Sequence, residues 1–276
     1  MRTSSLTSSR KRSKTYSQKN QAKRSNNRDS RGLVSVVGIG PGSFELLTPK
    51  AQSDIEEADV IVGYNTYIQL IQNLVRKKTE IISGTMGKEV ERAQIAVNKA
   101  KEGKKVVMVS SGDPGVYGMA GIVLEVAAKD QNPIQVNIIP GVTAATAVSA
   151  ILGAPLVSDF SVISLSDLLT PWEKIERRLE MAAQADVSIV LYNPRSQGRI
   201  EPLAKAYEIM TKHIKPDTPV GIVRQAGREG ENYIITTLKN MLNEKIDMVT
   251  TIIVGNSATK VVSGKMVTAR GYDLNR

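Results

Sequence analysis

Apolar and polar positions alternate in blocks along the chain from residue 32 onward. Runs rich in valine and isoleucine are separated by stretches whose apolar residues recur every three or four positions, the spacing of an amphipathic helix. Strands that alternate with helices are typical of parallel sheets. The pattern therefore predicts an α/β fold with mostly parallel or mixed sheets. The runs expected as strands are residues 33–39, 60–63, 105–110, 134–140, 187–192, 219–223 and 250–255.

Start and stop signals support three of the helical stretches. Thr48 can cap a helix whose first residue, Pro49, suits that position. Gly103 is a natural stop for the second helix. Thr170 and Glu173 have the spacing of a capping box, with a proline between them in the first turn. The three stretches predicted on these grounds are residues 49–58, 89–103 and 170–185.

The chain of 276 residues is long enough for two domains of ordinary size. Glycine, proline and aspartate gather in the segment 153–160, so we expect a hinge there. The predicted domains are residues 32–152 and 153–276, with the ligand cleft between them, since α/β sheets bind ligands beyond the carboxyl ends of their strands. Residues 131–158 carry no charge but contain three prolines, so they are interpreted as buried core and not as a membrane span.

The positive charge of the chain is concentrated in residues 1–31. This tail has ten basic residues and one acidic residue, whereas the remainder has 27 basic and 26 acidic residues and is nearly neutral. Its serine, lysine, arginine and asparagine content predicts a disordered segment without an enzymatic role. A transit peptide or a polyanion-binding arm is the alternative.

Two residue counts exclude whole classes of chemistry. The chain has no cysteine, which excludes disulfides, thiolate metal sites, iron–sulfur clusters and cysteine nucleophiles. It has one histidine, His213, which lies near a predicted helix end and is typical of a surface position. We therefore predict no metal site. The composition is compatible with the reducing cytoplasm, where we expect the protein to reside.

Three glycines follow the first predicted strand, in the stretch VGIGPGS. A dinucleotide-binding loop would need a third glycine where Ser43 stands, and Pro41 has no N–H to offer a phosphate. The acidic residue expected after the second strand is also missing, because that strand ends in VIVGYNT. The loop is shaped for close approach of a ligand but is poorly equipped for phosphate. A tight turn without a ligand is the alternative.

Further glycine-containing loops follow the later strands. The stretches VGIGPGSFELLTPKA, SSGDPGVYG, IPGVTAATAVSAILGAPL and IIVGNS together resemble the tetrapyrrole (corrin/porphyrin) methyltransferase family, over about residues 33–272. Within it, SGTMGKEVERA, ISLSDLLTPWEKIERRL and LYNPRS are similar to the branch that methylates C17 of precorrin-3B, or of its cobalt-bound counterpart, in cobalamin biosynthesis. The resemblance implies two α/β domains, a homodimer and S-adenosylmethionine as cofactor.

The resemblance also implies which residues bind the cofactor between the domains. Gly112 would permit backbone approach, Asp113 would offset the positive charge of the cofactor, and Thr143 would stand at a helix start with free donors. A tight turn is the alternative for residues 112–114. The complete set is Pro41, Gly42, Ser111, Gly112, Asp113, Val116, Thr143, Ala144, Asn193 and Ala226.

The substrate implied by the resemblance is a macrocycle edged with carboxylates, which suit planar guanidinium groups. Arg195 and Arg224 follow strand ends closely and are the predicted substrate-binding residues. Arg199 and Arg228 also follow strand ends, but are equally compatible with solvated surface positions. Tyr64 stands where some relatives carry an aspartate with an acid–base role. It is a candidate proton donor, and lining of the cleft is equally compatible with its position.

Methylation of C17 with ring contraction is therefore the expected reaction, on a precorrin-3B or cobalt-factor-III macrocycle. Methylation at another corrin position is the near alternative. An RNA-directed relative of the same fold is another, and the basic tail would suit it. The neutral body argues against a nucleic-acid partner, because phosphate binding normally needs a basic face on the folded domain. A nicotinamide oxidoreductase is disfavoured by the loop after the first strand.

Overall fold

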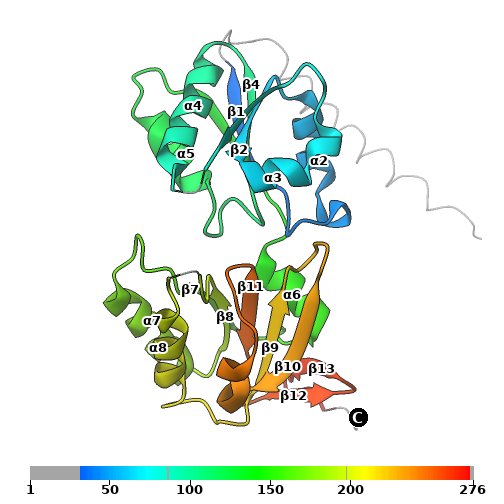
Figure 1. Cartoon of the computed structure of the whole chain (residues 1–276), viewed down its shortest axis with the longest axis vertical. Helices are drawn as coiled ribbons and strands as arrows, with labels where there is room; N and C mark the ends of the chain where they lie inside the picture. The colour runs from blue at the N-terminus through cyan, green and yellow to red at the C-terminus, as the bar shows by residue number, and fades with distance from the viewer. Residues whose placement is uncertain (1–31, 86, 197, 274–276) are drawn as a thin grey trace, which may run out of the picture.

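The structure is a computed structural model that describes residues 32–85, 87–196 and 198–273. Figure 1 shows two α/β domains one above the other, connected through the segment that leads into helix α6 (Ala144–Leu152). The α/β class expected from the alternating pattern is confirmed. The tail of residues 1–31, with the disorder predicted for it, lies outside the described residues. No helix among the described residues is long and apolar enough to cross a bilayer.

The first domain is built on a five-stranded, entirely parallel sheet. Its strand order is β3-β2-β4-β1-β5, so the carboxyl ends of all five strands lie at one edge. The runs predicted at residues 33–39, 60–63, 105–110 and 134–140 are all strands. The bounds are β1 (Leu33–Gly38), β2 (Val60–Tyr64), β3 (Glu80–Gly84), β4 (Lys105–Ser110) and β5 (Gln135–Ile139).

Alternate side chains of the central strands serve two cores. Val34 and Val36 of β1 pack beneath two helices on one face, and Val37 and Ile39 pack beneath two others on the opposite face. This two-sided burial explains why the strand reads as a continuous apolar run. The helices are α2 (Pro49–Glu57), α3 (Asn65–Leu70), α4 (Glu89–Lys101) and α5 (Ala120–Ala128), with short 3-10 turns η1 (Phe44–Leu46) and η2 (Gln72–Leu74).

The predicted helix signals have mixed outcomes. The Thr48 hydroxyl accepts a hydrogen bond from the Ala51 N–H at 3.2 Å, so the first cap is confirmed. Gly103 adopts a positive φ of 84° just after α4, as a helix stop should. The capping box at Thr170 is wrong, because α7 (Trp172–Gln184) is capped by Pro171 and has no side-chain cap bond.

The second domain has a mixed sheet in the order β10-β9-β11-β8-β7. Only the β7–β8 pair is parallel, and the other three pairs are antiparallel. A small third sheet has the order β12-β13-β6. The bounds are β6 (Gly153–Ala154), β7 (Phe160–Ser164), β8 (Ser188–Tyr192), β9 (Pro219–Arg224), β10 (Asn232–Thr237), β11 (Thr250–Val254), β12 (Thr259–Val262), β13 (Lys265–Thr268), α7, α8 (Glu201–Met210) and η3 (Leu238–Asn243).

Helix α6 packs with the second domain. Ala145, Val148 and Leu152 are buried against Val190 of β8 and Val223 of β9, on the face of the sheet opposite α7 and α8. Residues 153–154 pair with β13 and so belong to a sheet. Because α6 packs with the second domain, the chain passes from the first domain to the second near Gly141, ahead of α6. The expected boundary at 152 and 153, and the hinge at 153–160, lie inside the second domain.

Candidate functional site

Three loops meet at the carboxyl edge of the first sheet, at the ends of neighbouring strands β4, β1 and β5. The backbones of Gly40 and Gly112 exchange hydrogen bonds of 3.1 and 2.8 Å. A Cβ on Gly38 would lie 2.7 Å from the Gly112 carbonyl oxygen, and one on Gly141 would lie 2.2 Å from the same atom. These glycines are required because the loops touch through their backbones. The loop after β1 is therefore a junction between loops, and the binding of a ligand to it stays a prediction.

Asp113 fastens two of these loops together. Its carboxylate accepts hydrogen bonds from the N–H of Gly115 at 2.8 Å and from the N–H of Gly141 at 3.1 Å. The backbone of Val116 in turn donates to the Asp113 carbonyl at 3.2 Å. The predicted cofactor residues Gly112, Asp113 and Val116 are thus brought together in one rigid turn, half-buried at the junction of the domains.

Arg228 of the second domain reaches across to the first. Its Nε donates to the Pro41 carbonyl at 2.7 Å, and one of its terminal nitrogens donates to the Ser111 hydroxyl at 3.4 Å. Its aliphatic stem lies over Gly42, where a Cβ would be 2.6 Å from the Arg228 Cγ. Three of the predicted cofactor residues, Pro41, Gly42 and Ser111, therefore all contact Arg228. The sequence had not decided whether Arg228 is a site residue or a solvated surface arginine.

Tyr192, at the end of β8, holds the start of α6. Its hydroxyl lies 2.6 Å from the Thr143 hydroxyl and accepts a hydrogen bond from the Ala145 N–H at 2.7 Å. Burial raises the pKa of Tyr192 despite these hydrogen bonds. Gly112 lies beside this helix start, because a Cβ on it would be 3.9 Å from the Ala144 nitrogen. Thr143 and Ala144, two of the predicted cofactor residues, thus lie next to the loop after β4.

A second tyrosine crosses the domain junction. The Tyr117 hydroxyl donates to the Val162 carbonyl and accepts from the Ser164 N–H, both at 3.2 Å, and its ring centroid is 5.9 Å from that of Tyr192. Tyr117 has a positive φ of 53°, an uncommon conformation for a residue with a side chain. The sequence reasoning missed both tyrosines, because their partners are more than 40 residues away along the chain.

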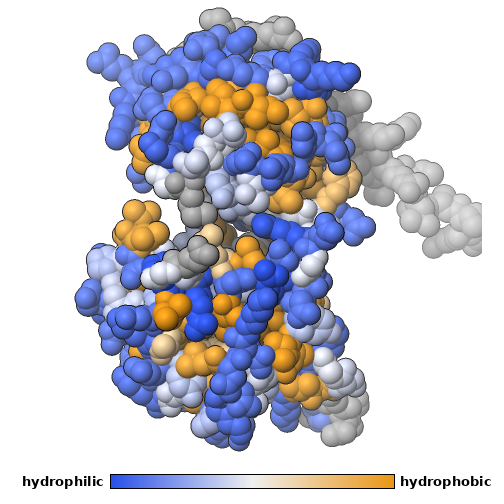
Figure 2. Space-filling view, viewed as in Figure 1, coloured by the Kyte–Doolittle hydropathy of each residue, from blue (hydrophilic) through white to orange (hydrophobic). Residues whose placement is uncertain are grey.

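Two loops of the second domain also carry residues with positive φ. Asn193 follows β8 with φ of 52°, and Gln225 follows β9 with φ of 54°. The Asn193 side-chain amide donates to the Ser164 hydroxyl at 2.9 Å. Ala226 packs against the core around α6. Such backbone conformations cluster at functional sites, where the surrounding structure holds them in place. The candidate site therefore includes loops from both domains, and Figure 2 shows the surface hollowed at the waist between them.

Tyr64 lies at the end of β2 and is half-buried. Its ring packs edge-on against that of Tyr67, with centroids 5.2 Å apart. Burial raises the pKa of Tyr67, while the nearby Arg228 guanidinium and a hydrogen bond to Ser111 act in the opposite direction. Tyr67 is thus linked to the Arg228 contact, and Tyr64 packs against Tyr67. The proton-donor role of Tyr64 stays a prediction.

The two predicted substrate arginines have different surroundings. The Nε of Arg195 is buried and has no hydrogen-bond partner among the described residues. Arg224 is paired, since its Nε donates to the Asp247 carboxylate at 2.6 Å and a terminal nitrogen donates to Gln225 at 3.1 Å. Burial alone would raise the pKa of Asp247, but its hydrogen bonds, foremost the one from Arg224, outweigh burial and lower it. A substrate carboxylate would have to compete with Asp247 for Arg224, whereas Arg195 has unused capacity.

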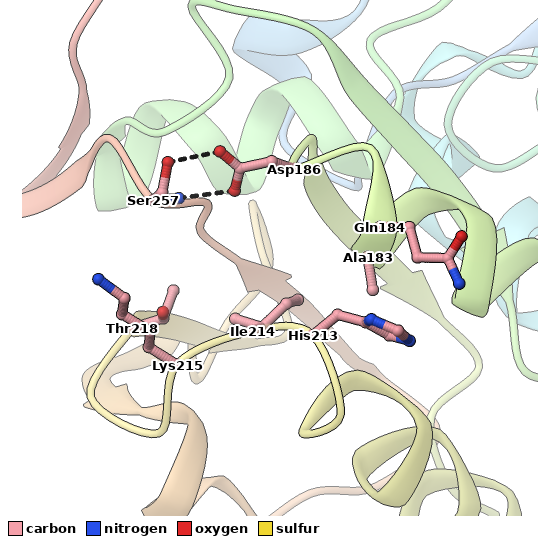
Figure 3. A pocket seen from close by; sticks show the side chains of 8 residues that line it. All are labelled: Ala183, Gln184, Asp186, His213, Ile214, Lys215, Thr218 and Ser257. Atoms are coloured by element: carbon pink, nitrogen blue, oxygen red, sulfur yellow. Dashed lines mark hydrogen bonds between the residues drawn. The ribbon is translucent and has the colours of Figure 1, made fainter.

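A pocket at the far edge of the second domain lies away from these loops (Figure 3). Asp186 and Ser257 on its wall are joined by two hydrogen bonds, one of them from the Ser257 N–H at 2.9 Å. His213 also lines it and contacts Glu180 at 2.6 Å, so it lies apart from the candidate site, as its sequence position indicated. Asp186 has a positive φ of 54°, which is explained by the turn that ends α7.

A second hollow, of about 350 Å³, lies between the domains. Leu46 of the first domain and Gly227 of the second line its two sides, and the exposed face of α6 forms its floor. A ligand pocket typically measures about 300–1,000 Å³ and is mostly apolar. The hollow has that size, and it adjoins the Arg228 contact because Gly227 packs against Pro41. It is lined by Leu46, Val142, Thr146, Ala147, Ala150, Ile151, Gly227 and Glu231.

Comparisons with known proteins identify the family. Residues 33–242 match the family Tetrapyrrole (Corrin/Porphyrin) Methylases. The chain is 48% identical over 246 residues to a cobalt-factor III methyltransferase of Priestia megaterium, covering 88% of this chain but only 45% of that protein. It is 47% identical over 242 residues to a probable cobalt-factor III C(17)-methyltransferase of Salmonella typhimurium, covering 88% of this chain and 100% of that protein.

The fold agrees with this similarity. The crystal structure of the methyltransferase CobJ superimposes with a TM-score of 0.82 at 36% sequence identity, covering 86% of this chain and 100% of that one. The chain thus spans the whole of the CobJ chain but less than half of the Priestia relative. The chain belongs to the tetrapyrrole (corrin/porphyrin) methylase family.

Proposed function

We propose that this protein transfers the methyl group of S-adenosylmethionine to C17 of cobalt-factor III, with contraction of the macrocycle, in cobalamin biosynthesis. The observation that carries the proposal is the 47% identity to the Salmonella protein over that protein's whole length. The metal-free precorrin-3B is the neighbouring substrate. Cobalt-factor III is preferred because it is named for both of the relatives described above.

The junction between the domains suits S-adenosylmethionine. Its positive sulfonium is favoured by a nearby negative charge, and the Asp113 carboxylate lies there with both oxygens held by backbone N–H groups. The half-buried start of α6 is beside it. The adjoining hollow of about 350 Å³ is apolar apart from Glu231 and a threonine, and so suits an uncharged portion of the cofactor. We therefore keep the ten residues assigned to the cofactor in the proposal.

The chemistry asks little of the protein beyond placement. When bound, S-adenosylmethionine supplies a methyl group on an excellent leaving group, which an electron-rich tetrapyrrole carbon can attack in line. The loops of both domains would hold the two reactants at the necessary distance and exclude water, which is a large part of catalysis in such reactions. Tyr117 and Arg228 would fix the domains relative to each other by their contacts across the junction, and Tyr192 would hold the start of α6 within the second domain.

On the substrate side, Arg195 would bind a carboxylate of the macrocycle through its guanidinium group. Arg224 would be a weaker partner, because Asp247 already occupies its Nε. Arg195 follows β8 and Arg224 is the last residue of β9, and these two strands are separated by β11. Neighbouring strands are about 4.8 Å apart, so the backbones of β8 and β9 are separated by about 10 Å. That spacing allows two carboxylates on one side of a macrocycle to be reached together. The homodimer and the cytoplasmic location stay predictions.

The product identifies the reaction. Incubation with cobalt-factor III and S-adenosylmethionine carrying a ¹³C methyl group should yield a product one methyl group heavier, with the label at C17 by carbon NMR. The metal-free precorrin-3B should be tested in parallel, and faster turnover on it would change the substrate but not the position. A label at C11 or C20, or labelling of RNA in place of a tetrapyrrole, would disprove the proposed reaction.

The cofactor claim has a separate test. S-Adenosylhomocysteine should bind the wild-type protein in calorimetry, and Asp113→Asn should weaken that binding about tenfold, since one charge-assisted hydrogen bond and the negative charge are lost. Glu244→Gln, on the second domain after η3, is the control and should bind as the wild type does. Binding of NADH without binding of S-adenosylhomocysteine would refute the cofactor assignment.

A further inference from the structure

Two adjacent leucines on the loop between β7 and α7 are unusually exposed. Leu168 is 76% exposed and Leu169 is 95% exposed, the two highest values for large apolar side chains among the described residues. Burying a leucine is favourable relative to leaving it in water. Two neighbouring leucines left in water therefore contribute nothing to the stability of the fold. Their exposure points to a role in binding.

The loop that carries them is tied down on both sides. Before them, Asp167 forms an ion pair with Arg199 at 2.9 Å, which joins this loop to the one after β8. The buried Leu165 donates its backbone N–H to the Tyr192 carbonyl at 2.9 Å. After them, Trp172 begins α7 and packs against the core of the second domain. The two leucines are thus presented outward by a loop with fixed ends.

Their position coincides with the candidate site. Strands β7 and β8 are parallel neighbours, so the loop after β7 and the loop that carries Arg195 leave the sheet at the same edge. That edge faces the first domain, because Ser164 at the end of β7 donates its N–H to the Tyr117 hydroxyl. Figure 2 shows a hydrophobic cluster on the loop between β7 and α7, beside the hollow between the domains.

We propose that Leu168 and Leu169 form the apolar wall of the substrate site. They pack against the face of the tetrapyrrole ring while Arg195, with its unpartnered Nε, binds a carboxylate at the ring's edge. A tetrapyrrole offers both features at once, a broad apolar face and a charged rim. This inference rests on the proposed function, because it takes the macrocycle as the ligand.

A second copy of the chain fits these leucines less well. A stable interface buries about 800 Å² on each partner. The neighbouring residues on the loop include the charged Asp167, and the next helix turns carry Glu173 and Lys174, both exposed. Two leucines alone supply only a minor share of such an area. A single ring, by contrast, can be covered by two side chains and anchored by one cation.

The test compares Leu168→Ser/Leu169→Ser with wild type and with Val261→Ser/Val262→Ser. The control valines lie on β12, in the small sheet, and are 50% and 54% exposed. Trp172 is the only tryptophan of the chain and lies three residues beyond Leu169. Bound cobalt-factor III should quench its fluorescence, so binding can be titrated without turnover. The leucine variant should raise the Kd for cobalt-factor III at least about tenfold, and the control should change it less than about twofold.

Two further readouts separate this inference from the alternatives. Calorimetry with S-adenosylhomocysteine should give the same Kd for all three proteins, and light scattering should give the same oligomeric state. Equal Kd values for cobalt-factor III in wild type and leucine variant would overturn the inference even if the label is found at C17. A change of oligomeric state in the leucine variant would assign the leucines to an interface between copies. Wild-type fluorescence that cobalt-factor III leaves unquenched would overturn both this inference and the proposed function.

Discussion

Replacement of Arg195 by alanine should raise the apparent KM for the tetrapyrrole about ten- to a hundredfold, while the Kd for S-adenosylhomocysteine stays nearly unchanged. A hydrogen bond to a charged group contributes about 1.5–3 kcal/mol, which corresponds to that range. The Nε of Arg195 is buried and has no partner among the described residues, so a substrate carboxylate could satisfy it once the side chain turns toward the ligand. Steady-state kinetics with varied tetrapyrrole and saturating cofactor measure the effect.

The same variant separates substrate binding from a structural role. A buried, unpartnered polar atom costs free energy, so its removal should leave the melting temperature unchanged or raise it. Arg195→Lys should restore affinity only in part, since an ammonium lacks the planar fork that matches a carboxylate. Arg177→Ala on the exposed side of α7 is the control and should behave as wild type. A lower melting temperature with an unchanged KM would show that Arg195 supports the loop and does not bind substrate.

Replacement of Gly141 by alanine should destabilise the protein by about 3 kcal/mol or more. The added Cβ would lie 2.2 Å from the Gly112 carbonyl oxygen and 2.8 Å from the Gly38 carbonyl carbon. Both atoms belong to the backbone, so no flexible side chain can move aside. The loops must separate, which breaks the hydrogen bond from the Gly141 N–H to Asp113. Denaturant unfolding measures the loss, and calorimetry should show that S-adenosylhomocysteine binding is lost as well.

Gly121→Ala is the matched control for this substitution. Gly121 lies in α5, and a Cβ placed on it would meet nothing within 4 Å. Alanine is favoured over glycine inside a helix by about 0.5–1 kcal/mol, so this variant should be slightly more stable than wild type. A Gly141→Ala protein that unfolds at the wild-type denaturant concentration would mean that the three loops can separate at little cost, against the close packing described above.

The central strands were predictable from sequence because they are buried on both faces. The run at residues 105–110 coincides with β4, whose valines and methionine serve the two cores of the first domain. The strands β3 and β10 were missed because they are edge strands with many exposed positions, and their apolar runs are only two and three residues long. The glycine loops were also predictable, because glycines directly after a buried strand mark a turn or a close approach of another backbone.

What the sequence determined by itself was the α/β class, the strand-end loops and the family resemblance, all of which depend on residues close together along the chain. Tertiary structure alone decided that α6 packs with the second domain, since its apolar face would fit either sheet. It also decided the partners of Tyr117, Tyr192 and Arg228, which lie 45, 49 and 187 residues away in sequence. Contacts at such separations depend on how distant elements pack and on how the two domains dock, and no local pattern of residue types encodes that geometry.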